Sequence, residues 1–302
     1  MSFRKMFLST LVFTVFFFGV SSICFGVIGA REGRDPFEAL NDRLKEKGSV
    51  KEISISKQIN WKTDQALTIR SVSSDIEIYQ STTGSSTIEV IGSATENLSD
   101  SIKLDVKVDE KGMTVKLIED ERTGENSKFD FFDLKKSIRF NDLKVKAYLA
   151  STPENLELVT VSGDVRMFVP LSKGLKVSSV SGEFIANGFS VENLDLKSIS
   201  GDVKMKDSTL RKAQFEVVSG DVELEVINED PEIKLNSVSG DGKFKFLSEP
   251  NFQVKLNSVS GDLKVHGESV NKKSWGGQRA KTLGLGKGQV EAHSTSGDLE
   301  IL

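Results

Sequence analysis

The chain has 302 residues, of which 37% are hydrophobic and 28% are charged, and its formal net charge is −4. This composition excludes an intrinsically disordered chain and a membrane protein with many spans. The acidic balance argues against a general nucleic-acid binder, because neutralising phosphates requires an excess of Lys and Arg on one face.

Residues 1–30 have the pattern of a secretory signal. Arg4 and Lys5 precede an uncharged stretch, 6–30, that is rich in Phe, Leu and Val, as in a positive n-region followed by an apolar core. One alternative is an uncleaved signal anchor, since the stretch is long enough to cross a bilayer. Another is a lipoprotein processed at Cys24, the single cysteine. We predict export, with membrane contact only through residues 1–30 if they are retained.

The segment 31–48 is predicted to be a short helix. Asp35 supplies an N-cap and Pro36 a first helical residue, and Gly48 follows the last apolar residues of the segment. Repetitive β proteins need a cap over the exposed end of their strand ladder. We therefore expect an N-terminal capping helix here.

Residues 49–302 repeat a short turn motif. The group Val161-Ser162-Gly163-Asp164 recurs, with small changes, about every 20 residues. The expected turn glycines are Gly163, Gly182, Gly201, Gly220, Gly240, Gly261 and Gly297. Since glycine adopts positive φ without steric cost, each is expected at a tight corner. The step from Gly261 to Gly297 is nearly twice the usual one, so it holds either a second period or an inserted loop.

Apolar and polar residues alternate on both sides of each turn. Leu156 and Leu158 precede the first turn, and Val165 and Met167 follow it. Period-two alternation indicates strands with one buried face, and a single strand–turn–strand unit cannot bury that face alone. The sequence therefore predicts an all-β fold, a single-stranded β-solenoid of about 20-residue coils over 49–302.

Two stretches interrupt the repeat: 119–142, which is rich in charges and phenylalanine, and 267–288, which is basic. The candidate ligand contacts in the second stretch are Lys272, Lys273, Trp275 and Arg279. Its cations and indole would suit an anionic or sugar-bearing polymer. The alternative is a solvated loop whose Trp covers the end of the core.

The acidic residues that follow the turn glycines form the other candidate site. Stacked coils would place these carboxylates about 5 Å apart, where they repel each other unless something relieves the charge. Calcium would relieve it, and its candidate ligands are Asp202, Asp221, Asp241 and Asp262, in a column that includes Asp164 and is interrupted by Glu183. The interpretation we adopt needs no cofactor: each Asp accepts backbone N–H groups at its own corner.

The tandem Ser-Gly-Asp turn, the leading signal segment and the repeat near 20 residues resemble the bacterial putative-adhesin domain family. The resemblance covers about Val50 to Leu302. It implies a right-handed β-solenoid on an exported or envelope-associated protein of unknown function, and it brings no catalytic residues.

No catalytic triad, zinc spacing or phosphate loop can be assembled from the sequence, which has only two histidines, His266 and His293. We therefore expect a non-catalytic protein of the periplasm, outer envelope or cell surface that presents a rigid surface to a glycan or protein ligand, for adhesion or scaffolding. The alternatives are a polysaccharide-active β-helix enzyme and a membrane-anchored envelope sensor or assembly factor.

Overall fold

The computed structural model describes residues 50–60, 65–95, 99–109, 112–118, 142–169, 171–270 and 278–302. The predicted signal segment, the predicted capping helix and most of the first insert, 119–141, lie outside these residues. Nearly all of the described residues belong to one compact unit, Lys51–Leu302. Among the described residues, no helix has the length and apolar character needed to cross a membrane.

The structure describes 22 strands, which confirms the all-β prediction for these residues. Their bounds are β1 Val50–Ile59, β2 Ala66–Arg70, β3 Asp75–Gln80, β4 Ser86–Thr95, β5 Lys103–Val108, β6 Gly112–Ile118, β7 Asp142–Leu149, β8 Asn155–Val159, β9 Val165–Phe168, β10 Leu171–Ser181, β11 Phe184–Asn187, β12 Ser190–Ser200, β13 Val203–Ser219, β14 Val222–Val226, β15 Glu232–Ser239, β16 Gly242–Phe246, β17 Phe252–Ser260, β18 Leu263–Val265, β19 Glu268–Ser269, β20 Gln278–Thr282, β21 Gly288–Ser296 and β22 Leu299–Ile301.

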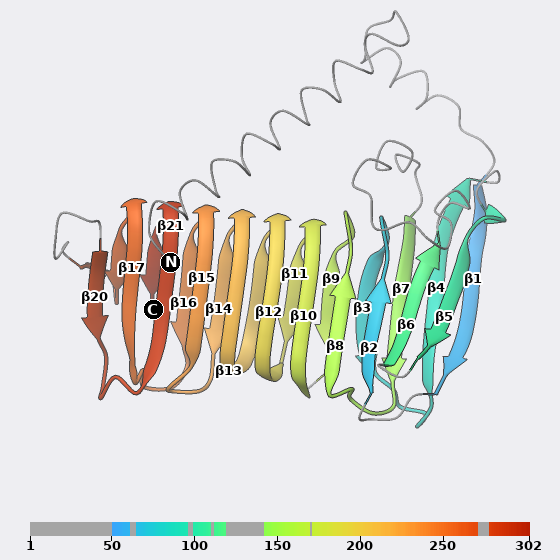
Figure 1. The fold of residues 1–302 in the computed structure, drawn as a ribbon, viewed down its shortest axis with the longest axis horizontal. Helices are drawn as coiled ribbons and strands as arrows, with labels where there is room; N and C mark the ends of the chain where they lie inside the picture. Colours follow the sequence, from blue (N-terminus) through green and yellow to red (C-terminus); the bar gives the residue numbers. More distant parts are fainter. Residues whose placement is uncertain are drawn as a thin grey trace, which may run out of the picture. The chain divides into compact units, whose positions relative to one another are not determined.

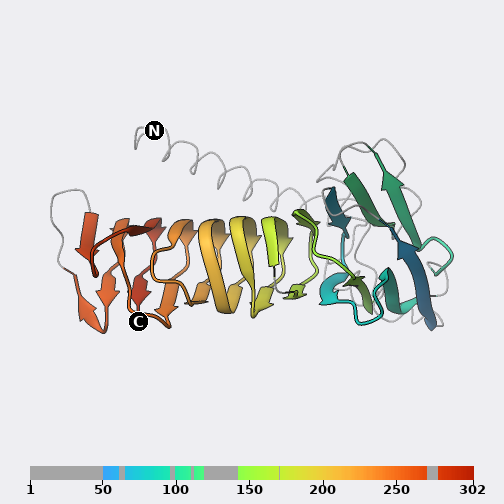
Figure 2. The same cartoon turned by 90° about the horizontal axis from the view of Figure 1, so that it is seen from below.

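The strands form two facing layers, visible edge-on in Figure 2. Sheet B holds the strands that precede the turns, such as β10, β12, β15, β17 and β21, and sheet A holds those that follow, such as β11, β14, β16, β18 and β22. The long strand β13 belongs to both. We call a sheet B strand, its turn and the following sheet A strand one coil. Neighbouring coils pair in parallel and in register (Figure 1), and antiparallel pairs occur towards both ends, as in β5–β6 and β17–β20.

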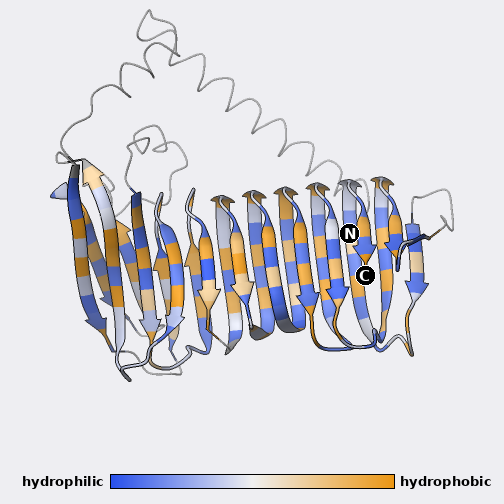
Figure 3. Ribbon diagram, turned by 180° about the vertical axis from the view of Figure 1, so that it is seen from behind, coloured by the Kyte–Doolittle hydropathy of each residue, from blue (hydrophilic) through white to orange (hydrophobic). Residues whose placement is uncertain are grey.

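Columns of like residues build the core between the sheets. Leu158, Val177, Leu196 and Phe215 are register partners from coil to coil, and each is at most 1% exposed. Figure 3 shows the alternation of apolar and polar residues along each strand that produces these columns. Stacking thus removes one face of the strands in these coils from water, which is the main stabilising contribution, and the predicted alternation is confirmed.

The order of the coils in space departs from their order in the sequence. Near the start, β2 lies between β6 and β8, and β3 between β7 and β9. Near the end, the C-terminal coil, β21–β22, lies between β15–β16 and β17–β18. The described residues of the long step from Gly261 to Gly297 therefore form no extra parallel coil. Its residues form β19 and β20, which pair antiparallel with β18 and β17, before the chain returns to insert its last coil.

The outward charges fit this inserted order. In each sheet an acid of the last coil is the register partner of two lysines: Glu291 of Lys234 and Lys255, and Glu300 of Lys243 and Lys264. Stacking in sequence order would instead place lysine beside lysine in both sheets. Cross-strand pairs of opposite charge stabilise a sheet and like charges destabilise it, so the charges favour insertion of the last coil.

We predict that Glu291→Lys destabilises the protein, because it puts three lysines in a row across sheet B. The expected loss of unfolding free energy is about 1 kcal/mol, measured by urea unfolding, and it should shrink in high salt. The triple variant Lys234→Glu, Glu291→Lys, Lys255→Glu restores the alternation and should recover most of the stability. If the triple variant is as unstable as the single one, the charge columns do not favour this order.

Candidate functional site

The Ser-Gly-Asp turns lie one above another along one edge of the unit, which we call the turn edge. Its glycines come so close that a Cβ on Gly201 would lie 2.1 Å from the carbonyl oxygen of Gly182. Positive φ is confirmed at five of the seven turn glycines, Gly182, Gly201, Gly220, Gly240 and Gly297.

The prediction of positive φ is wrong for Gly163 and Gly261, which lie outside the left-handed region. Their reason for being glycine is the close approach alone. A Cβ would lie 2.1 Å from the Ser74 carbonyl oxygen at Gly163, and 2.0 Å from the Gly297 carbonyl oxygen at Gly261. Contact with the neighbouring coil, more than turn conformation, therefore demands glycine along this edge.

The serine that precedes each turn glycine is exposed, and from Ser181 onwards these serines are register partners of one another in the stacked coils. The turn edge therefore presents a row of hydroxyl groups about 4.8 Å apart. The exposed members of the row are Ser162, Ser181, Ser200, Ser219, Ser239, Ser260 and Ser296. Each hydroxyl can both donate and accept a hydrogen bond.

The acidic residues that follow the glycines form a second row, which we call the carboxylate ladder. The N–H of Asp221 donates to Asp202 Oδ1 (3.0 Å), and the N–H of Asp241 donates to Asp221 Oδ1 (2.8 Å). The other rungs run from Asp164 to Asp75, Glu183 to Asp164, Asp298 to Asp241 and Asp262 to Asp298. The prediction that each Asp serves its own corner is wrong, because stacking brings the N–H of the next coil within reach of the carboxylate.

At each end of the carboxylate ladder an arginine donates hydrogen bonds to the terminal carboxylates. Arg166 donates to Asp75 Oδ2 (3.2 Å) and to Asp164 Oδ2 (2.7 Å). At the other end Arg279, only 3% exposed, donates to Asp262 Oδ1 (2.7 Å). Such charge-assisted bonds offset part of the repulsion along the ladder. Arg279, a predicted ligand contact, is thus engaged with the protein's own carboxylate. The other predicted contacts, Lys272, Lys273 and Trp275, lie outside the described residues.

The calcium hypothesis for Asp202, Asp221, Asp241 and Asp262 finds no cluster to support it. Within the part of the chain that the structure describes, no group of three or more His, Cys, Asp or Glu side chains could hold a metal ion. One oxygen of each of these carboxylates is taken up by a ladder rung or, at Asp262, by Arg279. The acidic column is therefore held by N–H groups and arginines.

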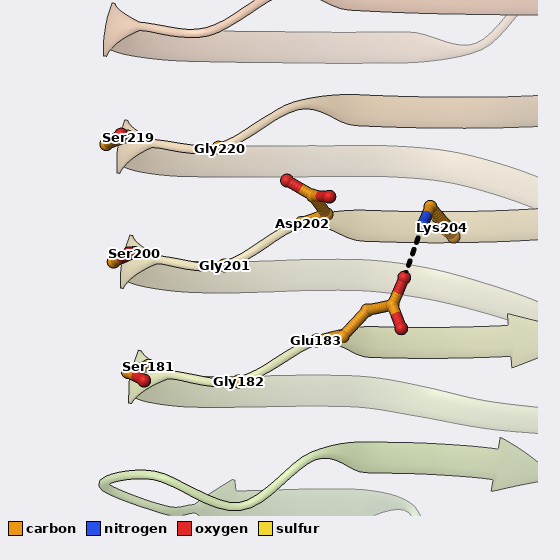
Figure 4. A pocket seen from close by; sticks show the side chains of 9 residues that line it. All are labelled: Ser181, Gly182, Glu183, Ser200, Gly201, Asp202, Lys204, Ser219 and Gly220. Carbon is orange, nitrogen blue, oxygen red and sulfur yellow. Dashed lines mark ion pairs between the residues drawn. The ribbon is translucent and has the colours of Figure 1, made fainter.

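The ladder has one break, at Glu183. Its side chain is one methylene longer than Asp, and its carboxylate pairs with Lys204 in the next coil (Figure 4). The hydrogen bond to Glu183 raises the pKa of the Lys204 ammonium group. None of the described hydrogen bonds takes the N–H of Asp202, which the missing rung would have used. Neither Glu183 nor Lys204 was predicted from the sequence to be a ligand contact. The signal that could have identified this site was the interruption of the Asp column by Glu183.

An open groove of about 590 Å³ surrounds this break. It runs across three successive turns, and Figure 4 shows its side chains. It is lined by Ser181, Gly182, Glu183, Ser200, Gly201, Asp202, Lys204, Ser219 and Gly220. These residues supply hydroxyls, one amine and two carboxylates, so the groove offers both hydrogen-bond donors and acceptors, and no residue of its lining has an apolar side chain.

Among the described residues, two carboxyl groups, those of Glu77 and Glu216, have clearly lowered pKa values, which favours their ionised form. Burial raises the pKa of Glu77, but the Tyr79 hydrogen bond and the charges of Lys144 and Lys146 outweigh it, and the net pKa is lowered. The hydrogen bond from Lys197 lowers the pKa of Glu216. A general acid at neutral pH needs the opposite shift. These two groups therefore act as structural anions.

Glu77 generates a prediction for the pH dependence of stability. A carboxyl whose folded pKa is lowered stabilises the protein above its unfolded pKa, and this contribution is lost as the pH falls through the folded pKa. We expect Glu77→Gln to lower the melting temperature at neutral pH and to flatten its decline in acid, with Tyr79→Phe intermediate. Equal declines for wild type and Glu77→Gln would contradict this assignment.

Together these features define an all-β protein of parallel, in-register coils joined by repeated Ser-Gly-Asp turns. The chain belongs to the Toastrack DUF4097 family, whose model matches residues 65–302. DUF denotes a domain of unknown function, so membership brings the fold and no assigned activity. The resemblance found in the sequence is thereby confirmed. No curated protein matches the chain.

Solved structures from several bacteria match the chain at low identity. A putative adhesin from Bacteroides fragilis is 15% identical, with a TM-score of 0.40, and the match covers 83% of this chain and 97% of that one. A putative cell adhesion protein from Clostridium sporogenes is 12% identical, with a TM-score of 0.38, covering 83% and 99%. A putative lipid binding protein from Parabacteroides distasonis is 16% identical, with a TM-score of 0.35, covering 82% and 96%. With scores this low, the family match alone carries the assignment.

Proposed function

We propose that this protein is an exported, non-catalytic binding or scaffolding protein whose coils wind as a right-handed solenoid. The observation that carries the proposal is the turn edge, where hydroxyls and carboxylates repeat from coil to coil on a closely packed backbone. An array held by stacked backbone loses little conformational freedom when a ligand binds. The expected ligand is a glycan or protein of the envelope or cell surface.

The pairing of charges on the sheet faces bears on the kind of ligand that the protein would bind. Many lysines are paired with acids of a neighbouring coil, as in Lys197–Glu216 (2.8 Å), Lys212–Glu232 (2.9 Å) and Lys245–Glu225 (2.9 Å). The faces therefore carry little uncompensated charge, which disfavours nucleic acid as a partner. Recognition would then rest on hydrogen bonds at the turn edge more than on net charge.

The signal pattern of residues 1–30 supports a location outside the cytoplasm, in the periplasm, the outer envelope or on the surface. We expect an epitope tag placed after Leu302 to be digested by protease once the outer envelope is opened and the inner membrane is still intact. A cytoplasmic marker in the same cells is the control and should survive. Digestion on untreated cells would place the tag at the surface.

Two results would contradict the proposal. One is a tag that stays protected until the inner membrane is lysed, which would show that the chain is not exported. The other is turnover: release of reducing ends from acidic polysaccharides by the purified protein, with or without calcium, would replace binding by catalysis.

A further inference from the structure

The break in the carboxylate ladder leaves an unfilled hydrogen-bonding position at the centre of the groove. At the six intact rungs an Asp oxygen accepts the N–H of the acidic residue in the next coil, at 2.7–3.0 Å. At the break, Glu183 turns aside to Lys204, and the N–H of Asp202 has no acceptor among the described groups. A ligand oxygen in the position of the missing carboxylate would complete the rung.

The charged groups around this position determine whether an anionic, a cationic or a neutral ligand group fits there. A ligand anion would lie close to the carboxylates of Glu183 and Asp202, with Lys204 as the single cation in the groove lining, and like charges repel at such distances. A ligand cation would compete with Lys204, which already pairs with Glu183. A neutral hydroxyl can accept from the Asp202 N–H and donate to the Glu183 carboxylate, so it satisfies both groups.

The remaining lining fits a compound with several hydroxyls. Ser181, Ser200 and Ser219 stand in register on successive coils, so the groove repeats its hydroxyls over about 10 Å, close to the length of two sugar rings. We propose that this groove binds the hydroxyl groups of a neutral glycan, with Glu183, Lys204 and the Asp202 N–H as its central contacts. This deepens the proposed binding function and rests on it.

The decisive variant is Glu183→Asp. It gives position 183 the side chain that builds the other rungs, so its carboxylate should accept the Asp202 N–H as Asp164 accepts that of Glu183 (2.9 Å). The protein would then fill the site with its own oxygen while keeping its fold. The matched variant, Asp221→Glu, should create a second binding position two coils further along the turn edge. There the new Glu would pair with Lys243, as Glu183 pairs with Lys204, and the N–H of Asp241 would lose its acceptor.

The experiment is amide NMR of the full-length chain with maltose, cellobiose and N,N′-diacetylchitobiose as probes at millimolar concentration. We expect at least one disaccharide to shift the Asp202 amide saturably. Glu183→Asp should weaken that binding about tenfold, as expected for one lost hydrogen bond, and should slow hydrogen exchange at Asp202. Asp221→Glu should add a sugar-dependent shift at the Asp241 amide.

Each other outcome overturns the inference. If none of the three disaccharides shifts Asp202, or if Glu183→Asp binds them as well as wild type does, the groove is not a site for neutral glycans. If galacturonate, used as an additional acidic probe, shifts the Asp202 amide and the three disaccharides do not, the site takes an acidic ligand. These results would leave the proposed function standing if the protein still binds its envelope ligand elsewhere, whereas turnover of the sugars would end both proposals.

Discussion

The structure depends on how closely neighbouring backbones approach at the turns. A Cβ on Gly201 would lie 2.1 Å from the Gly182 carbonyl oxygen, and a Cβ on Gly297 would lie 2.2 Å from that of Gly240. Only glycine permits this contact, and the contact holds the coils in register. Once register is fixed, each strand position becomes a column of like residues. The inward columns pack as the core, and the outward columns must accommodate charges about 4.8 Å apart.

That second requirement connects the fold to the site. On the sheets, acids and lysines are placed beside each other, as with Glu291 between Lys234 and Lys255. On the turn edge the column is acidic throughout, and it is held because the carboxylates within it accept a backbone N–H from the next coil, while the last one, Asp262, accepts from Arg279. Glu183 is the exception, since one added methylene directs its carboxylate to Lys204. The groove that we propose as a glycan site is a consequence of that single departure from the repeat.

Much of this fold could be predicted from the sequence, because period, alternation and turn glycines are local signals. The spatial order of the coils could not, since every coil carries the same turn and any two could stack in register. The outward charges are what distinguish the inserted order from the sequential one: Glu291 between Lys234 and Lys255 in sheet B, and Glu300 between Lys243 and Lys264 in sheet A. The site was harder to predict. The N–H of each acidic turn residue is accepted by a carboxylate of another coil, and the sequence alone does not show this pairing. Without it, the replacement of Asp by Glu183 cannot be recognised as a missing hydrogen bond.

Disulfide trapping tests the coil order most directly. In a Cys24→Ser background, Ser239→Cys combined with Ser296→Cys should crosslink within one chain, because these residues are register partners, and the strand spacing of about 4.8 Å suits a disulfide. Ser239→Cys combined with Ser260→Cys should not, because the last coil separates them by about 10 Å. The account predicts the first crosslink without the second. An intramolecular Ser239→Cys/Ser260→Cys disulfide without the first would show that the coils stack in sequence order and would contradict it.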